Sequence, residues 1–151
     1  MINIKYLIWA LLAGSFIPVV GILNGRVGRA LGEPLHASIL LFAVAILLAV
    51  TVATLAGRGL PNIGDFRQLQ PVEYLAGFVV AFYVISATVL AGKIGVANFI
   101  VMAVSGQIIF SLLIDHFGLL GAPIRPVNLV QLGGASMLLG GLIISQLANG
   151  K

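Results

Sequence analysis

The sequence predicts an all-α integral membrane protein, a helical bundle of five transmembrane helices. Hydrophobic residues make up 60% of the 151 residues and charged residues only 8%, with a mean hydropathy of +1.17. A typical soluble domain carries about 25% charged residues. The apolar residues also gather in five uncharged runs, at residues 6–23, 37–57, 74–92, 94–114 and 126–150. Each run can cross a hydrocarbon core, which needs about 20 helical residues.

A closed β-barrel is the other structure that satisfies its backbone groups in lipid. Its strands would appear as alternating segments of about 10 residues, and the sequence contains none. We therefore expect one transmembrane domain over residues 1–151. Its helices are predicted at about residues 5–30, 35–57, 72–92, 94–115 and 127–148.

The first run follows Lys5, as the apolar core of a signal peptide would. No convincing small-x-small cleavage site follows, so we expect this helix to remain as a signal anchor. Pro18 lies within the span and should kink it, because proline lacks the N–H of a regular helix. Asn24 should point into the bundle, since a carboxamide facing lipid is costly. Arg26 and Arg29 then complement the C-terminal end of the helix dipole.

The second helix is predicted to begin at Glu33 and Pro34, with an acid at the positive helix end and proline in the first turn. The polar connection that follows, residues 57–73, places Ile63, Phe66 and Leu69 at helical spacing. A short helix on the membrane surface is expected there. The turn at residues 91–98 is so short that it predicts antiparallel third and fourth helices.

The fourth helix carries a polar stripe, because Gln107, Ser111 and Asp115 are spaced four residues apart. Asn98 and Ser105 lie on roughly the opposite side. Asp115 comes at the end of its apolar run, close to the interface, so it avoids the cost of about 2.5 to 3.5 kcal/mol for a charge at the bilayer centre.

Two interpretations of Asp115 remain open. In the structural one, which we favour, it forms an ion pair or hydrogen bond that holds the helix end, with Arg125, Arg26 or Arg29 as partner. In the functional one, it is a gate or proton relay at the mouth of a cavity lined by Gln107 and Ser111.

The fifth helix contains small residues at the spacing that lets membrane helices approach closely. Gly133 and Gly134 precede two small-xxx-small pairs, Ser136 with Gly140 and Gly141 with Ser145. We expect these positions to pack against another helix, within one chain or between two chains.

The basic residues predict an ambiguous orientation. Five spans place four of them on one side (Lys5, Arg58, Arg67 and Arg125) and four on the other (Arg26, Arg29, Lys93 and Lys151). Because an excess of cytoplasmic Lys and Arg sets topology, the tie indicates insertion in both directions. Two opposite copies would then form an antiparallel homodimer of ten helices, which resembles the inverted repeats of many transporters. Alternatively, burial of Arg26 and Arg29 within the protein would break the tie.

Other classes of protein are disfavoured. The basic residues are scattered between spans, without the basic patch that binds nucleic acid. No carboxylate pair, nucleophile with a base, or cluster of metal ligands has usable spacing, so we expect neither an enzyme nor a cofactor. The chain has no cysteine, which excludes disulfides and thiolate metal sites.

Several motifs resemble the YdcZ-like small five-span family of the drug/metabolite transporter superfamily. They are Asn24 with Gly28, GEPLHA at residues 32–37, KIGVAN at 93–98 and GQIIFSLLIDHFG at 106–118. The resemblance implies an inner-membrane exporter that works as an antiparallel pair. Two features depart from the pattern: Val20 stands where the family has a glutamine, and the first helix lacks the glutamate with which the small multidrug-resistance relatives exchange protons.

These observations lead us to expect a carrier that works by alternating access. Few charges line the candidate cavity, so the substrate should be a neutral or weakly polar small molecule, or a hydrophobic cation held by an aromatic ring. The candidate contact residues are Asn24, Asn98, Ser105, Gln107, Ser111, Tyr83 and Trp9. A small channel or a non-transporting accessory subunit is the alternative.

Overall fold

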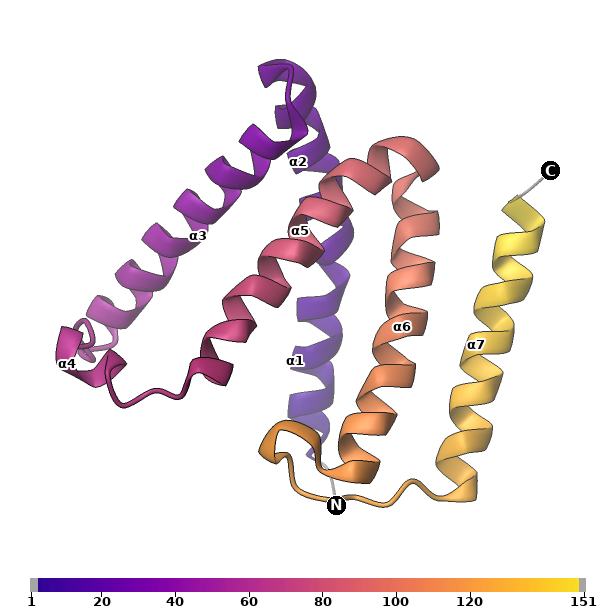
Figure 1. Ribbon diagram of the computed structural model, residues 1–151. Helices are drawn as coiled ribbons and strands as arrows, with labels where there is room; N and C mark the ends of the chain where they lie inside the picture. The colour runs from indigo at the N-terminus through magenta and orange to yellow at the C-terminus, as the bar shows by residue number, and fades with distance from the viewer. Residues whose placement is uncertain (1–2, 150–151) are drawn as a thin grey trace. The chain divides into compact units, whose positions relative to one another are not determined.

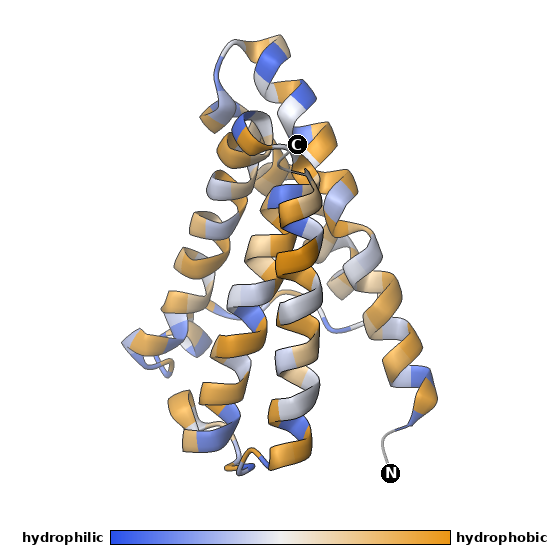
Figure 2. Ribbon diagram, turned by 90° about the vertical axis from the view of Figure 1, so that its right-hand side faces the viewer, coloured by the Kyte–Doolittle hydropathy of each residue, from blue (hydrophilic) through white to orange (hydrophobic). Residues whose placement is uncertain are grey.

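The computed structural model describes residues 3–149, and within this range the chain is helical without a β-strand (Figure 1). Five helical segments are long and apolar enough to cross a membrane, which confirms the predicted number of spans. They are Ile4–Leu31, Pro34–Leu55, Pro71–Ile94, Val96–Phe117 and Leu129–Ala148. Figure 2 shows hydrophobic residues along most of each helix, with hydrophilic residues gathered towards helix ends and connections.

The chain divides into two compact units, residues 1–96 and 97–151. Each unit is described separately below. The arrangement of the whole chain as one transmembrane domain stays a prediction.

The first span is interrupted, as Pro18 predicts. It consists of α1 (Ile4–Ser15) and α2 (Ile17–Leu31), with Phe16 between them. Pro18 has no N–H to donate to the carbonyl of Gly14, so the regular hydrogen bonds stop here. Helix α2 ends at Gly32, whose φ of 73° suits a residue without Cβ.

The second span, α3 (Pro34–Leu55), begins as predicted. The side chain of Glu33 accepts a hydrogen bond from the N–H of Leu35 at 3.3 Å, and Pro34 occupies the first turn. Glu33 is therefore a cap of this helix. Both features satisfy or remove N–H groups that have no partner at a helix start.

The connection after α3 contains one turn of helix, α4 (Ile63–Phe66), and a short 3₁₀ helix, η1 (Pro71–Tyr74). The hydroxyl of Tyr74 in η1 donates a hydrogen bond to the carbonyl of Phe66 in α4 at 2.9 Å and thereby connects the two short helices. Ile63, Phe66 and Leu69 are exposed, as expected for a surface segment that meets the lipid interface.

Helices α2, α3 and α5 (Leu75–Ile94) form the packed part of the first unit. Gly28 is in the closest contact between α2 and α3, because a Cβ there would lie 3.2 Å from Cα of Pro34 and 3.7 Å from Cβ of Ala37. Ala37 itself is fully buried. Small residues thus let these helices approach closely, as in other membrane bundles.

The second unit contains α6 (Val96–Phe117), the short 3₁₀ turn η2 (Leu119–Gly121) and α7 (Leu129–Asn149). Gly118, with φ of 62°, ends α6. The N–H of Arg125 then donates to the carbonyl of Asp115 at 2.7 Å, and the N–H of Val127 donates to Nδ1 of His116 at 3.2 Å. The segment from Asp115 to Gly118 therefore builds the connection between α6 and α7.

Large apolar side chains are exposed along every span, for example Trp9 at 73%, Leu55 at 84% and Met137 at 80%. No large side chain among residues 3–149 is fully buried. In water such a surface would aggregate, whereas lipid or another apolar helix covers it at no cost.

Candidate functional site

A cluster of buried polar side chains lies where α2, α3 and α5 meet. It consists of Asn24, Ser38 and Thr88, whose exposed fractions are 6%, 3% and 5%. Each residue comes from a different helix, so the cluster joins the three helices at one point. Buried polar groups in a membrane bundle are expected to bond to one another across helices.

Thr88 is the centre of this cluster. Its hydroxyl donates to the carbonyl of Val84 at 2.8 Å, within α5. Its oxygen accepts from Nδ2 of Asn24 at 2.5 Å, and Oγ of Ser38 lies 3.5 Å away. Since the proton of Thr88 is directed to Val84, Ser38 must be the donor in the last pair.

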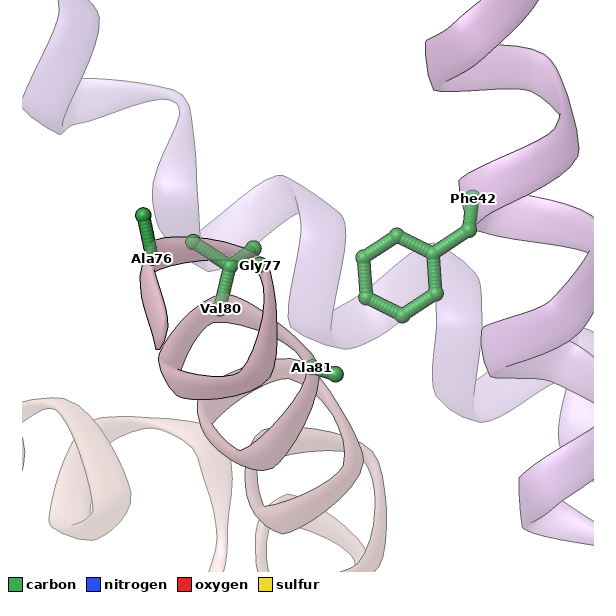
Figure 3. Close-up of a pocket in the computed structure, with 5 residues that line it drawn as sticks. All are labelled: Phe42, Ala76, Gly77, Val80 and Ala81. Atoms are coloured by element: carbon green, nitrogen blue, oxygen red, sulfur yellow. The ribbon is translucent and has the colours of Figure 1, made fainter. Parts of the chain in front are cut away.

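An apolar cavity of about 520 Å³ lies beside α5. Figure 3 shows the ring of Phe42 directed from α3 towards the residues of α5 that line the other side, Ala76, Gly77, Val80 and Ala81. Three of these four residues are Ala or Gly, so little side-chain volume fills the space. Every lining residue is apolar and none is charged.

Helical spacing connects the cavity to the polar cluster. Phe42 follows Ser38 by four residues in α3, and Ala81 precedes Thr88 by seven residues in α5. Residues at these spacings lie on one face of a helix. Ser38 and Thr88 therefore lie on the same faces of α3 and α5 as the cavity, further along each helix.

The polar stripe predicted on α6 lies on the surface of the second unit. Gln107, Ser111 and Asp115 are all exposed, and the hydroxyl of Ser111 donates to the carbonyl of Ile108 in its own helix. Asn98 and Ser105 are partly buried, and Ser105 donates to the carbonyl of Val101. In this unit the stripe does not line an enclosed cavity.

Comparison with known protein families identifies the chain. Residues 5–144 match the family model described as "Putative inner membrane exporter, YdcZ". The chain belongs to this family. The match covers most of the sequence, so the resemblance of the motifs in α2, α3 and α6 is confirmed, and with it the placement as a multi-pass inner-membrane protein. No curated protein and no solved structure shows significant similarity to the chain.

Within this YdcZ family member, Asn24 is the predicted contact residue that the structure buries. Tyr83 is partly buried on α5, and Trp9 is 73% exposed on α1. Roles in substrate contact stay predictions for all of them. Among residues 3–149 no group of three or more His, Cys, Asp or Glu residues could hold a metal ion.

Arg29 and Asp115 lie in the last turns of α2 and α6, and Arg26 lies about one turn before Arg29. Arg26, Arg29 and Asp115 are exposed. Arg125 meets Asp115 through a hydrogen bond between their backbones, and the ion pair of the side chains stays a prediction. Neither Arg26 nor Arg29 is buried within the first unit, and the dual topology stays a prediction.

Within the described part of the second unit, no helix packs closely against the small residues of α7. A Cβ added at Gly133, Gly134, Gly140 or Gly141 would meet no atom within 4 Å. Ser136 and Ser145 are exposed. The packing role of these positions stays a prediction.

Sequence reasoning missed three polar residues of the spans: Ser38, Thr88 and Gln146. Each interrupts an apolar helix, and that was the available signal. Ser and Thr often bond to their own helix backbone, as Thr51 does with the carbonyl of Leu47. Only the packing of α2 against α5 separates Thr88 from such ordinary cases.

Proposed function

We propose that this protein exports an uncharged small molecule with an apolar body and one polar group, by alternating access in an antiparallel homodimer. The observation that carries the proposal is the apolar cavity of about 520 Å³ between α3 and α5, with the buried hydroxyls of Ser38 and Thr88 on the same faces of these two helices. Pockets of this kind, apolar with a few placed polar groups, are the usual form of small-molecule sites. Membership in a family described as an inner-membrane exporter supports the transport role.

The chemistry of the cavity supports a neutral substrate over a cation. Its lining contains no acid that could balance a positive charge, and an unpaired charge in an apolar site is costly. A carboxamide such as that of Asn24 can both donate to and accept from a polar group of the substrate. Phe42 and Val80 would contact the apolar body.

Two features of the chain support the proposed dimer. Exposed glycines on α7 leave room for another helix, and four basic residues on each side give no preferred orientation. Two opposite copies would place two identical cavities in inverted orientation. Rocking of one copy against the other would then open the shared path to each side in turn.

Filling the cavity tests the transport role. Everted vesicles that contain the protein should take up the neutral dye Nile red saturably, and more effectively than the cationic dye ethidium. Val80→Trp should abolish uptake, because the indole occupies the cavity. Val79→Trp, at the neighbouring position outside the lining, should leave uptake unchanged. Equal uptake by both variants would exclude this cavity as the substrate site. If neither dye is taken up saturably, the result would favour a non-transporting accessory subunit.

Labelling from each side of the membrane tests the dimer. The chain has no cysteine. A single cysteine introduced next to Lys151 therefore reports on which side of the membrane the C-terminal end of the chain lies. An impermeant maleimide should label about half of the molecules from each side. Labelling from a single side would exclude dual topology. Any dimer would then consist of two parallel copies of the chain.

A further inference from the structure

A carboxamide oxygen in the second unit has no hydrogen-bond donor. Oε1 of Gln146, in the last turns of α7, is covered by protein and accepts no hydrogen bond from residues 3–149. An acceptor removed from water without a donor is unfavourable. In a membrane the cost persists, because lipid tails offer no donor.

Ser105 on α6 does not supply a donor to Oε1 of Gln146. Ser105 lines the same groove as Gln146, but its hydroxyl proton is directed to the carbonyl of Val101 at 2.8 Å. A serine hydroxyl has a single proton. The described part of this unit therefore supplies no donor to Oε1 of Gln146.

The carboxamide borders a groove of about 160 Å³ between α6 and α7. Apart from Ser105 and Gln146, its lining is apolar, and its walls include Val101, Met102, Leu142 and Ile143. A cavity of about 150 Å³ lined by apolar side chains takes up benzene in another protein. A single aromatic ring or a molecule of similar size therefore fits this groove.

We propose that this groove binds a small uncharged molecule of that size which carries one hydroxyl or N–H group, and that this group donates to Oε1 of Gln146. A charged ligand would find no counterion in the lining. The inference goes beyond the proposed export, because binding here requires neither a transport cycle nor the cavity beside α5.

A second copy of the chain is a less suitable source of the donor. Helical spacing places Leu142, Ile143 and Gln146 on one face of α7, and Gly134 and Gly141 on roughly the opposite face. The glycine face is the one that leaves room for another helix. The groove and the expected helix contact are thus separate surfaces of α7.

Binding of two matched probes tests the inference. The protein in lipid nanodiscs is titrated with 4-fluorophenol and with 4-fluorotoluene, which replaces the hydroxyl by a methyl group. Fluorine NMR reports binding, and empty nanodiscs correct for partitioning into lipid. The wild type should prefer 4-fluorophenol by about five- to tenfold, which corresponds to one hydrogen bond.

In Gln146→Met the side chain keeps its length and loses the acceptor, so the preference should disappear. Gln131→Met is the matched control on the same helix, since the oxygen of Gln131 already accepts from the N–H of Asn128 at 3.1 Å. It should retain the preference. Circular dichroism checks that both variants keep their helix content.

Two results would overturn the inference. One is a wild type that binds both probes equally, or binds neither probe above the level of empty nanodiscs. This comparison tests the inference even if Gln146→Met does not fold. The other is an unchanged preference in folded Gln146→Met. A change in oligomeric state without any change in probe binding would assign the donor to a second copy instead.

Discussion

The bond between Asn24 and Thr88 shows how one residue acts inside an apolar span. Asn24 places a carboxamide in a helix where lipid would not solvate it, and Thr88 supplies an acceptor from α5. Interhelical hydrogen bonds in membranes contribute about 0.6 kcal/mol on average and up to about 1.7 kcal/mol. The bond joins two residues that are 64 positions apart in the sequence but adjacent in the fold.

At this scale we predict that Thr88→Val destabilises the protein by about 1 kcal/mol. Valine keeps the shape of threonine but removes the acceptor of Asn24, which is then left buried without its partner. The free energy of unfolding, measured by titration with SDS and followed by circular dichroism, should fall accordingly.

Thr51→Val is the matched control for that measurement. The hydroxyl of Thr51 is exposed and bonds only to its own helix backbone, so its loss should change the free energy by less than about 0.5 kcal/mol. Equal effects of the two substitutions would mean that the bond to Asn24 contributes nothing to stability.

At the scale of helices, the contact between α2 and α3 depends on the absence of a side chain at Gly28. Its Cα faces the first turn of α3, where Pro34 brings the backbone close. This contact sets the position of Ser38, one turn further along α3, next to Thr88. The position of Ser38 in the polar cluster therefore depends on the close contact of α2 and α3 at Gly28.

We predict that Gly28→Val destabilises the protein by about 1 to 3 kcal/mol more than Gly106→Val. Both substitutions put a β-branched residue into a helix, but only at Gly28 would Cβ lie 3.2 Å from the backbone of Pro34. Gly106 has open space around it. The same SDS titration measures the difference, and equal values for both variants would contradict the close contact.

At the scale of the whole molecule, a single copy leaves most of its large apolar side chains exposed. Lipid can cover these surfaces, so exposure by itself does not demand a partner. The glycines of α7 are more specific, because small residues allow the close backbone contacts that hold membrane helices together. For this reason we place the expected dimer contact on the face of Gly134 and Gly141.

We predict that Gly141→Leu weakens dimerisation at least tenfold, because Leu fills the space of a partner helix. The free energy of unfolding of the protomer should stay unchanged, since a Cβ at this position would meet no atom beyond its own helix backbone within 4 Å. Cross-linking yield at increasing lipid dilution measures the association. Gly92→Leu, at another open glycine in α5, is the control. Unchanged cross-linking in Gly141→Leu would place the interface elsewhere.

The sequence by itself determined the fold class, the number of spans and the main helix signals. These features depend on local chemistry: uncharged runs set the spans, Pro18 interrupts the first one, and Glu33 with Pro34 begins the second. Each is decided within a few residues, so reading along the chain suffices. The family motifs, which are also contiguous, could be recognised in the same way.

The tertiary structure decided which polar residues share a site. Asn24 was expected to point into the bundle, but its partners Ser38 and Thr88 lie on other helices and have no mark in the sequence that distinguishes them from Thr51. The stripe of Gln107, Ser111 and Asp115 has the right spacing for one face, yet that face is exposed in its own unit. Helical spacing fixes which residues share a face of one helix, whereas only the packing of separate helices decides what that face meets.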